Sequence, residues 1–394
     1  MTPLLSIILL FLISYLGWLL YNRFSSQSAL LNHIYVSGSL YLVIGFLIGP
    51  KLIGLIDEGI ISELNVLLGL VLGWTGFLIG LQAKRQEMKR FQEGYYLFVT
   101  LNFLIMLLGS VFLLIILSNI LGLNFRLSNL AVLAIAGAVS SPILIAILRK
   151  EYKMRGHAIH LLQFSAAYDN MLGVFIFGIA LIFFNPGLGI NIYTFISYIL
   201  SLSFSGLMAY LFFIISKRIL NDQQFLLLLI GFLLVIVGVA LNVNISLIFT
   251  AFFFGLVLTN LPLETRRLYH SISQAEKPLY YLMLIFVGAS IHSVSVDAII
   301  LVALFIIIRF FLKIASGYTA RLSIIPQERP IKTIGIPHLG IGGLAVAMIL
   351  DYHVSYPTEL SQSLLFAIAI SMIIMTFISP RVFKQALEYR LKNG

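Results

Sequence analysis

Residues 157–184 read HAIHLLQFSAAYDNMLGVFIFGIALIFF, an apolar stretch that is long enough to cross a membrane as one helix. Asp169 lies near the middle of this stretch, and the other 14 of the 15 acidic residues fall in polar connections or near the ends of apolar runs. A carboxylate at bilayer depth costs about 3 kcal/mol or more unless it faces protein or water. Asp169 is therefore a candidate for an ion or proton site on a transport path.

The composition indicates a membrane protein built from many helices. The chain has 394 residues, of which 60% are hydrophobic and 10% are charged, and apolar runs of membrane-spanning length recur from end to end. Soluble domains carry about 25% charged residues, so this class is excluded. Cysteine is absent, which excludes disulfides and thiolate metal sites. No nucleotide-binding, metalloprotease or serine-hydrolase motif occurs, so we expect neither an enzyme nor a cofactor.

The distribution of basic residues predicts the topology. With 13 spans and the N-terminus outside, the inner connections hold 21 of the 25 Lys and Arg residues, and the outer connections hold only Lys51 and Arg126. We therefore predict a multi-pass protein of the cell membrane (inner or plasma) with a cytoplasmic C-terminus. The net charge of +10 follows from this topology and does not indicate nucleic-acid binding. The predicted spans are approximately 3–22, 32–56, 61–82, 95–118, 127–148, 157–183, 191–215, 223–241, 245–262, 278–294, 297–319, 332–351 and 360–379.

Two spans contain residues that interrupt helices near mid-depth. Proline removes a backbone donor and clashes with the preceding turn, and clustered glycines weaken a helix. Two interrupted spans about seven spans apart are typical of an inverted-repeat transporter, whose binding site lies where the broken helices meet. The alternative is that these residues only produce kinks or close helix contacts. The fifth span carries Gly137, Ser140, Ser141 and Pro142, and the twelfth carries Gly335, Pro337, His338, Gly340, Gly342 and Gly343.

The eleventh predicted span holds the two basic residues that lie inside the membrane, Arg309 and Lys313. They are four residues apart and therefore share a helix face. Either residue is a candidate partner of Asp169, with the depth in the span favouring Arg309. Two alternatives are a purely structural ion pair with Asp169 and, for Lys313, a side chain that reaches the inner interface. His338, at the second interruption, is a candidate proton relay.

Five segments resemble the monovalent cation:proton antiporter superfamily, in particular the bacterial sodium/proton and potassium/proton exchangers with thirteen spans. Each motif alone is weak, but their order and spacing agree over nearly the whole chain. The alignment of the buried basic residue with this family favours Lys313 as the partner of Asp169. The segments are YLVIGFLIGPKLIGLI (41–56), GWTGFLIGLQAKRQEMKR (73–90), SAAYDNMLGV (165–174), the tract from GLVLTNL to FVGASI (255–291) and LKIASGYTARL (312–322).

This resemblance implies an all-α membrane fold of about 13 transmembrane helices, built as an inverted repeat with two broken helices that cross. It also implies a homodimer in which transport helices move against a scaffold. We assign residues 1–380 to the transmembrane domain, with the core at about 61–183 and 278–379 and the dimerisation scaffold at about 1–56 and 190–262. Residues 381–394 are a short cytoplasmic tail, which leaves room for a separate regulatory subunit.

The resemblance also assigns the ion site, with one departure. The family usually has Asp-Asp or Asn-Asp in the sixth span, and the second carboxylate binds the cation or the proton in turn. Here the pair is Asp169-Asn170. We expect Asp169 to bind Na⁺ or K⁺ and H⁺ alternately, with neutral oxygens from Asn170, Ser140 and Ser141, in an electroneutral exchange. Two other functions stay open: a channel-like K⁺ path, and a non-transporting membrane sensor or subunit.

Overall fold

The chain folds as a bundle of helices. The computed structural model describes residues 37–56, 58–151, 157–183, 192–218, 221–262, 265–320 and 335–393, together with six residues of the predicted first span, which otherwise lies outside this part. The elements are α3 (Ser39–Ile48), α4 (Glu58–Glu63), α5 (Asn65–Leu81), α6 (Arg85–Met88), α7 (Glu93–Ile120), α8 (Leu127–Ala138), α9 (Pro142–Glu151), α10 (His157–Phe183), α11 (Ile192–Ser216), α12 (Asp222–Val243), α13 (Leu247–Asn260), α14 (Thr265–Ala289), α15 (Val296–Ala320), the 3₁₀ turn η3 (Ile336–His338), α16 (Gly343–Ser355) and α17 (Glu359–Asn393).

The prediction of an all-α membrane protein is confirmed. In the described part of the chain, seven helical segments are long and apolar enough to cross a membrane, one of them the interrupted segment Leu127–Glu151, and α3, α5 and α13 are shorter apolar helices. The count of 13 spans stays a prediction. Helix α17 continues through Asn393, so most of the predicted tail extends the last helix.

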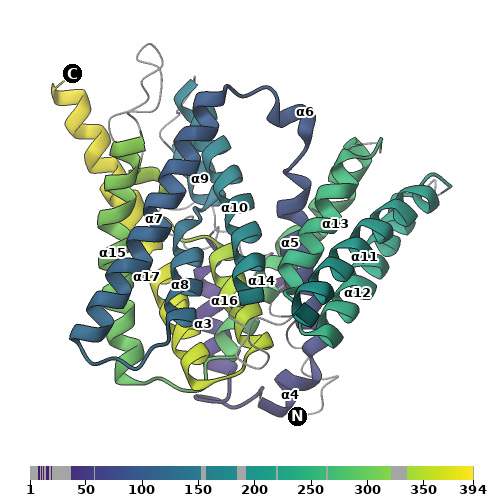
Figure 1. The fold of residues 1–394 in the computed structure, drawn as a ribbon, viewed down its shortest axis with the longest axis horizontal. Coiled ribbons are helices and arrows are strands. Elements are labelled where there is room, and N and C mark those ends of the chain that lie inside the picture. Colours follow the sequence, from purple (N-terminus) through teal and green to yellow (C-terminus); the bar gives the residue numbers. More distant parts are fainter. Residues whose placement is uncertain are drawn as a thin grey trace.

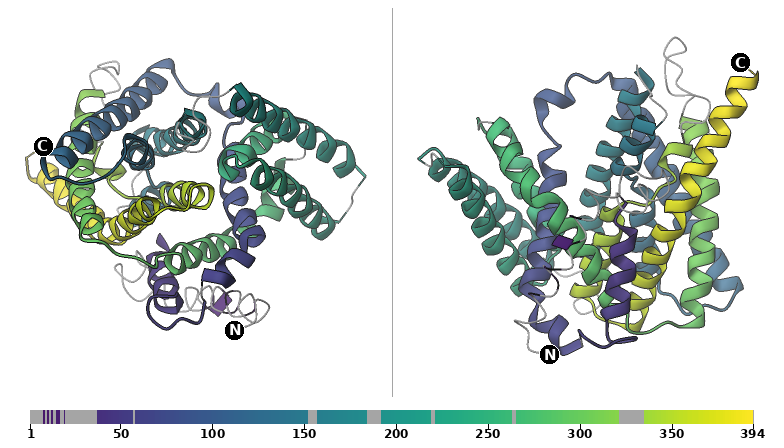
Figure 2. Two further views of the ribbon diagram at one scale, coloured as in Figure 1. Left: turned by 60° about the horizontal axis from the view of Figure 1, so that its bottom comes forward. Right: turned by 180° about the vertical axis from the view of Figure 1, so that it is seen from behind.

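The helices form two groups (Figures 1 and 2). Helices α7, α8, α10, α15, α16 and α17 pack together in one group, and α5, α11, α12 and α13 form the other, with α14 in contact with both. Helix α6 and the last turns of α17 lie at one end of the bundle, which we name the α6 end, and α4 lies at the opposite end (Figure 1). The charge distribution predicts that the α6 end faces the cytoplasm, and this orientation stays a prediction.

Helix α5, which the resemblance assigned to the core, packs closely along α13. A Cβ atom on Gly76 would overlap the carbonyl oxygen of Ile248, and one on Gly80 would overlap that of Phe252. The same close approach joins α3 to α14, where a Cβ on Gly45 would overlap the carbonyl of Ile285. Small residues permit such backbone contact between membrane helices, where packing and not the hydrophobic effect drives association.

We expect Gly76→Ala to lower the stability of the folded protein by roughly 1–3 kcal/mol, because the added methyl group would force α5 and α13 apart. Gly231→Ala on α12 is the matched control, since a Cβ there meets nothing within 4 Å. Thermal unfolding in mild detergent, followed by tryptophan fluorescence, measures both variants. Equal unfolding temperatures for the two would contradict the prediction.

Candidate functional site

Both predicted interruptions are present, and they meet. Helix α8 ends at Ala138, Val139 is extended with φ −69° and ψ 153°, and α9 begins at Pro142. Proline suits this first helical position, where no helical acceptor is available for an N–H. In the second break, the chain runs from η3 to the first residue of α16, Gly343. A Cβ on Gly342 would lie 3.2 Å from the Cα of Ser141, so the two breaks cross in direct contact.

The glycines of the second break are required by their neighbours. A Cβ on Gly340 would overlap the Leu144 side chain of α9, and one on Gly343 would overlap the ring of Tyr280 on α14. Tyr280 in turn donates a hydrogen bond of 2.7 Å to the carbonyl of Ser37. The positions Gly340, Gly342 and Gly343 therefore let the broken segment pass between α9 and α14.

Arg309 on α15 binds the peptide carbonyls that the two breaks leave without helical partners. Its Nη2 donates to Val139 (3.0 Å) in the first break and to Gly340 (3.0 Å) and His338 (3.3 Å) in the second. Its Nε donates to the carbonyl of Leu339 at 3.3 Å. The side chain is 0% exposed. Because carbonyls at the end of a helix lack partners within it, this guanidinium holds the crossing together.

Lys313, one turn further along α15, reaches the carboxyl end of α8. Its ammonium donates to the carbonyl of Ala138 at 2.6 Å and to the Ser140 hydroxyl at 3.2 Å. It lies 3.9 Å from Oδ2 of Asp169. A positive charge at the carboxyl end of a helix is favourable, because the helix dipole is negative there. Of the two basic candidates, Lys313 is thus the one in ion-pair contact with Asp169.

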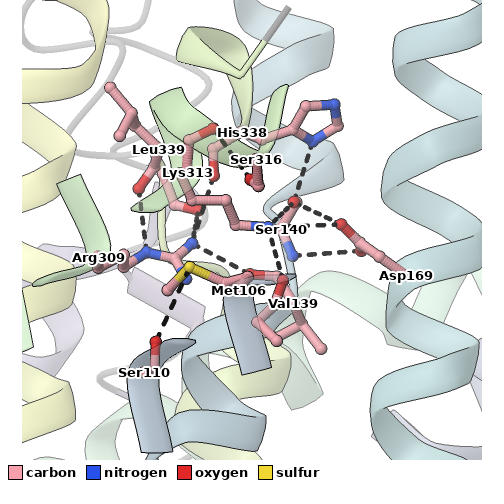
Figure 3. A network of polar contacts seen from close by, with 12 residues as sticks. Met106, Ser110, Val139, Ser140, Asp169, Arg309, Lys313, Ser316, His338 and Leu339 are labelled. Carbon is pink, nitrogen blue, oxygen red and sulfur yellow. Dashed lines mark hydrogen bonds and ion pairs between the residues drawn. The ribbon is translucent and has the colours of Figure 1, made fainter. Parts of the chain in front are cut away.

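Ser140 connects the charged residues of the site, as Figure 3 shows. Its hydroxyl donates to Oδ2 of Asp169 at 2.5 Å, and its backbone N–H donates to Oδ1 at 3.2 Å. The hydroxyl also lies 2.9 Å from Nδ1 of His338. One hydroxyl has one hydrogen and two lone pairs, so with its hydrogen on Asp169 it accepts from Lys313 and from His338. This assigns the His338 proton to Nδ1, and Nε2 is buried without a hydrogen-bond partner in the described part of the chain.

The charges around the crossing do not cancel. Arg309, Lys313 and Asp169 are all buried, which gives two positive groups against one negative group. Asn170, at the position of the family's second carboxylate, is neutral. The net charge of these three groups is therefore positive even when Asp169 is ionised, and it is more positive when Asp169 carries a proton.

A cavity of about 520 Å³ leads from the α6 end toward the crossing. Its rim includes the exposed residues Gln82, Glu276 and Lys277, and its deep end includes Ser140, Ser141 and Asn170. Asp169 is not among the lining residues. The Oδ1 atom of Asn170 is buried and has no hydrogen-bond partner within the described residues. Of these two adjacent residues, Asn170 is thus the one that lines the cavity.

Two acidic residues of interest were missed by the sequence analysis. Glu276 is the only acid among the described lining residues of the cavity, and it falls before the predicted tenth span because the amphipathic start of α14 resembles a loop. Asp351 was placed at the end of the twelfth span, yet its side chain is 0% exposed. Asp169 is thus not the only acid buried in the apolar interior. No local signal identifies Asp351, because its partners lie about one hundred residues away.

The chain is similar to known ion exchangers over nearly its whole length. Residues 8–387 match the family model described as sodium/hydrogen exchanger, transmembrane. A solved structure of the sodium proton antiporter MjNhaP1 from Methanocaldococcus jannaschii at pH 8 is similar with a TM-score of 0.69 and 17% identity, covering 98% of this chain and 99% of that one. An electron-microscopy structure of the same antiporter has a TM-score of 0.61 and 16% identity, covering 98% of each chain. No curated protein matches.

Proposed function

Because the chain belongs to the sodium/hydrogen exchanger family, we propose that it exchanges Na⁺ or K⁺ for H⁺, with Asp169 as the shared site. The observation that carries this proposal is a buried carboxylate at the crossing of two broken helices, one residue away from a side chain that lines a cavity. Such residues inside the membrane mark ion paths. The solved relative is itself described as a sodium proton antiporter.

The geometry suggests how one carboxylate exchanges a cation for a proton. A cation that enters the cavity meets the free Oδ1 of Asn170, and the hydroxyls of Ser140 and Ser141 line the same end. These neutral oxygens suit a hard monovalent cation that gives up part of its water shell. At Asp169 the cation competes with the Ser140 hydroxyl, with the Lys313 ammonium and with a proton. One carboxylate exchanges one charge for one charge, so the exchange is electroneutral.

His338 gives the proton a route out of the site. Its Nδ1 contacts the Ser140 hydroxyl at 2.9 Å, and that hydroxyl contacts Asp169. When Asp169 carries a proton, it can donate to the Ser140 hydroxyl, whose own hydrogen then points to Nδ1 of His338, and the histidine proton lies on Nε2. A proton that leaves Asp169 can thus pass through this hydroxyl to Nδ1 while the proton on Nε2 is released. We assign His338 the role of a proton relay on this basis.

The oligomeric state, the orientation in the membrane and the motion of the helices are inferred from the topology and the family. The chain acts as a homodimer in the cell membrane, with its N-terminus outside and its C-terminus in the cytoplasm. The core, which contains the crossing, moves against the scaffold so that the site faces each side in turn. The cavity extends to the α6 end, which supports a cytoplasm-facing site in this conformation.

A second function is favoured by one observation. The carboxylate of Asp169 already contacts Ser140 and Lys313 and does not line the cavity, and the residue that does is neutral. A fixed ion pair of this kind suits a membrane sensor or subunit that keeps the antiporter fold without transporting. A channel-like K⁺ path with the same fixed pair is the remaining alternative.

Purified protein in liposomes with a pH-sensitive dye distinguishes these functions. An imposed pH gradient collapses on addition of Na⁺ or K⁺ if the protein is an antiporter. It collapses only in the presence of a protonophore if the protein is a uniporter, and it persists in both cases if the protein does not transport. A persistent gradient with both cations would overturn the proposal.

We expect Asn170→Asp to make transport sensitive to the membrane voltage. The new carboxylate lines the cavity and adds a second group that can carry a proton, so more than one charge is exchanged per cation. Asn242→Asp is the control. Asn242 lies near the end of α12, its side chain is exposed, and it donates a hydrogen bond to the carbonyl of Gly238 in the same helix. Flux is measured in liposomes with an imposed K⁺ diffusion potential. Flux that stays independent of voltage in Asn170→Asp would contradict this prediction.

A further inference from the structure

Asp351 on α16 makes contacts that the exchange of ions does not use. Its carboxylate accepts three hydrogen bonds, all from the beginning of α13. The Ser246 hydroxyl donates to Oδ2 at 2.6 Å, the backbone N–H of Leu247 donates to Oδ1 at 3.1 Å, and that of Ile248 donates to Oδ2 at 3.2 Å. Asp351 and Ser246 are both buried. The carboxylate thus caps a helix to which it is not connected in sequence.

This cap is essential to the start of α13. The first N–H groups of a helix have no partners within it, and an unmet one inside a membrane costs several kcal/mol. Ser246 satisfies one of them locally, because its hydroxyl accepts from the N–H of Phe249 at 3.1 Å. The N–H groups of Leu247 and Ile248 use Asp351. The positive end of the helix dipole also favours a carboxylate there.

The contact lies between the two groups of helices and at the end opposite to the cavity. Helix α13 packs with α5 and α11, whereas α16 packs with α8 and α17. Asn260, at the other end of α13, accepts a hydrogen bond from the backbone of Arg85 in α6, so the start of α13 lies away from the α6 end. The cavity therefore opens at the α6 end, and the carboxylate of Asp351 links the two groups of helices near the opposite end.

We propose that Asp351 is a latch that keeps the outer end of the transport path closed by tying α16 to α13. All three hydrogen bonds break before the site opens to the outside. The proposal rests on the alternating access described under the proposed function. Asp351 is a positioning residue: it acts through α16, whose first residues form the second break beside the ion site. Once released, the start of α13 is capped by water that enters from the outer side.

The absence of cysteine allows a direct test by labelling, because any introduced cysteine is the only one in the chain. Ala347→Cys is the outer probe, since Ala347 is 0% exposed and lies one turn before Asp351 on the same face of α16. Ile143→Cys is the inner probe, since Ile143 lines the cavity. A membrane-impermeant maleimide is applied to the outer side for the first probe and to inside-out vesicles for the second.

We expect Asp351→Ala to raise the labelling rate of the outer probe at least about tenfold, equivalent to 1.4 kcal/mol in the conformational equilibrium, and to lower that of the inner probe. Asp297→Ala, in the first turn of α15, is the control and leaves both rates unchanged. Opposite changes on the two sides identify a shift between two conformations, which a loosened fold would not produce. Increased labelling of both probes, or no change in either, would overturn the proposal.

Asp351→Asn keeps the test valid if the alanine variant does not fold. The amide retains one acceptor of similar shape but cannot accept all three hydrogen bonds, so the same opposite changes are expected at smaller amplitude. Unchanged labelling in a folded Asp351→Asn protein would count against the latch. Labelling requires no ion flux, so a failure of antiport in the dye assay and a failure of the latch are separate results.

Discussion

Asp169→Asn is expected to reduce cation-dependent proton flux to the level of empty liposomes while leaving the protein folded. The amide has nearly the size of the carboxylate, and its oxygen still accepts from Ser140, but it neither releases a proton nor attracts a cation. Lys313 keeps its hydrogen bond of 2.6 Å to the carbonyl of Ala138, so its ammonium is not left without a partner. We therefore expect Asp169→Asn to abolish the proton flux without unfolding the protein.

The dye assay measures this variant beside Asp222→Asn, which replaces an exposed carboxylate in the first turn of α12 and leaves the flux unchanged. Size-exclusion chromatography and the unfolding temperature verify that both variants are folded. Full flux in Asp169→Asn would show that the exchanged proton is carried elsewhere, and the proposed shared site would then be wrong.

The two breaks could be predicted because their causes are local. Proline at 142 and glycines at 342 and 343 disfavour a continuous helix whatever surrounds them. The placement of a lone acid in an apolar run is similarly visible in the sequence. These features indicated both the fold and the place in it where the broken helices and Asp169 meet.

Other features depend on the packing of distant segments and leave no trace in a single sequence. Arg309 and Lys313 share one helix face, and only their distances to α8 and α10 show that the first binds carbonyls while the second approaches Asp169. Adjacent residues on a helix point about 100° apart, so Asn170 lines the cavity and Asp169 does not. The sequence does not show which of the two lines the cavity.

The second large effect that we expect concerns Arg309, and it is an effect on stability. Arg309→Met keeps most of the volume of the side chain but leaves four carbonyls of the two breaks without their donor. An unmet buried polar group costs about 1–3 kcal/mol. Replacing a buried ion pair with apolar residues can be neutral when both partners are removed. Here the partners are peptide carbonyls, which no substitution removes.

We therefore expect Arg309→Met to lower the free energy of unfolding by several kcal/mol and the unfolding temperature by roughly 10 °C. Arg309→Lys is expected to be intermediate, because an ammonium is a compact charge and cannot match the planar fork that reaches both breaks. Arg126→Met, at an exposed arginine before α8, is the control and stays near the wild-type temperature. An unchanged unfolding temperature in Arg309→Met would mean that the carbonyls of the crossing find other donors, and Arg309 would then be free to act on the transported ion.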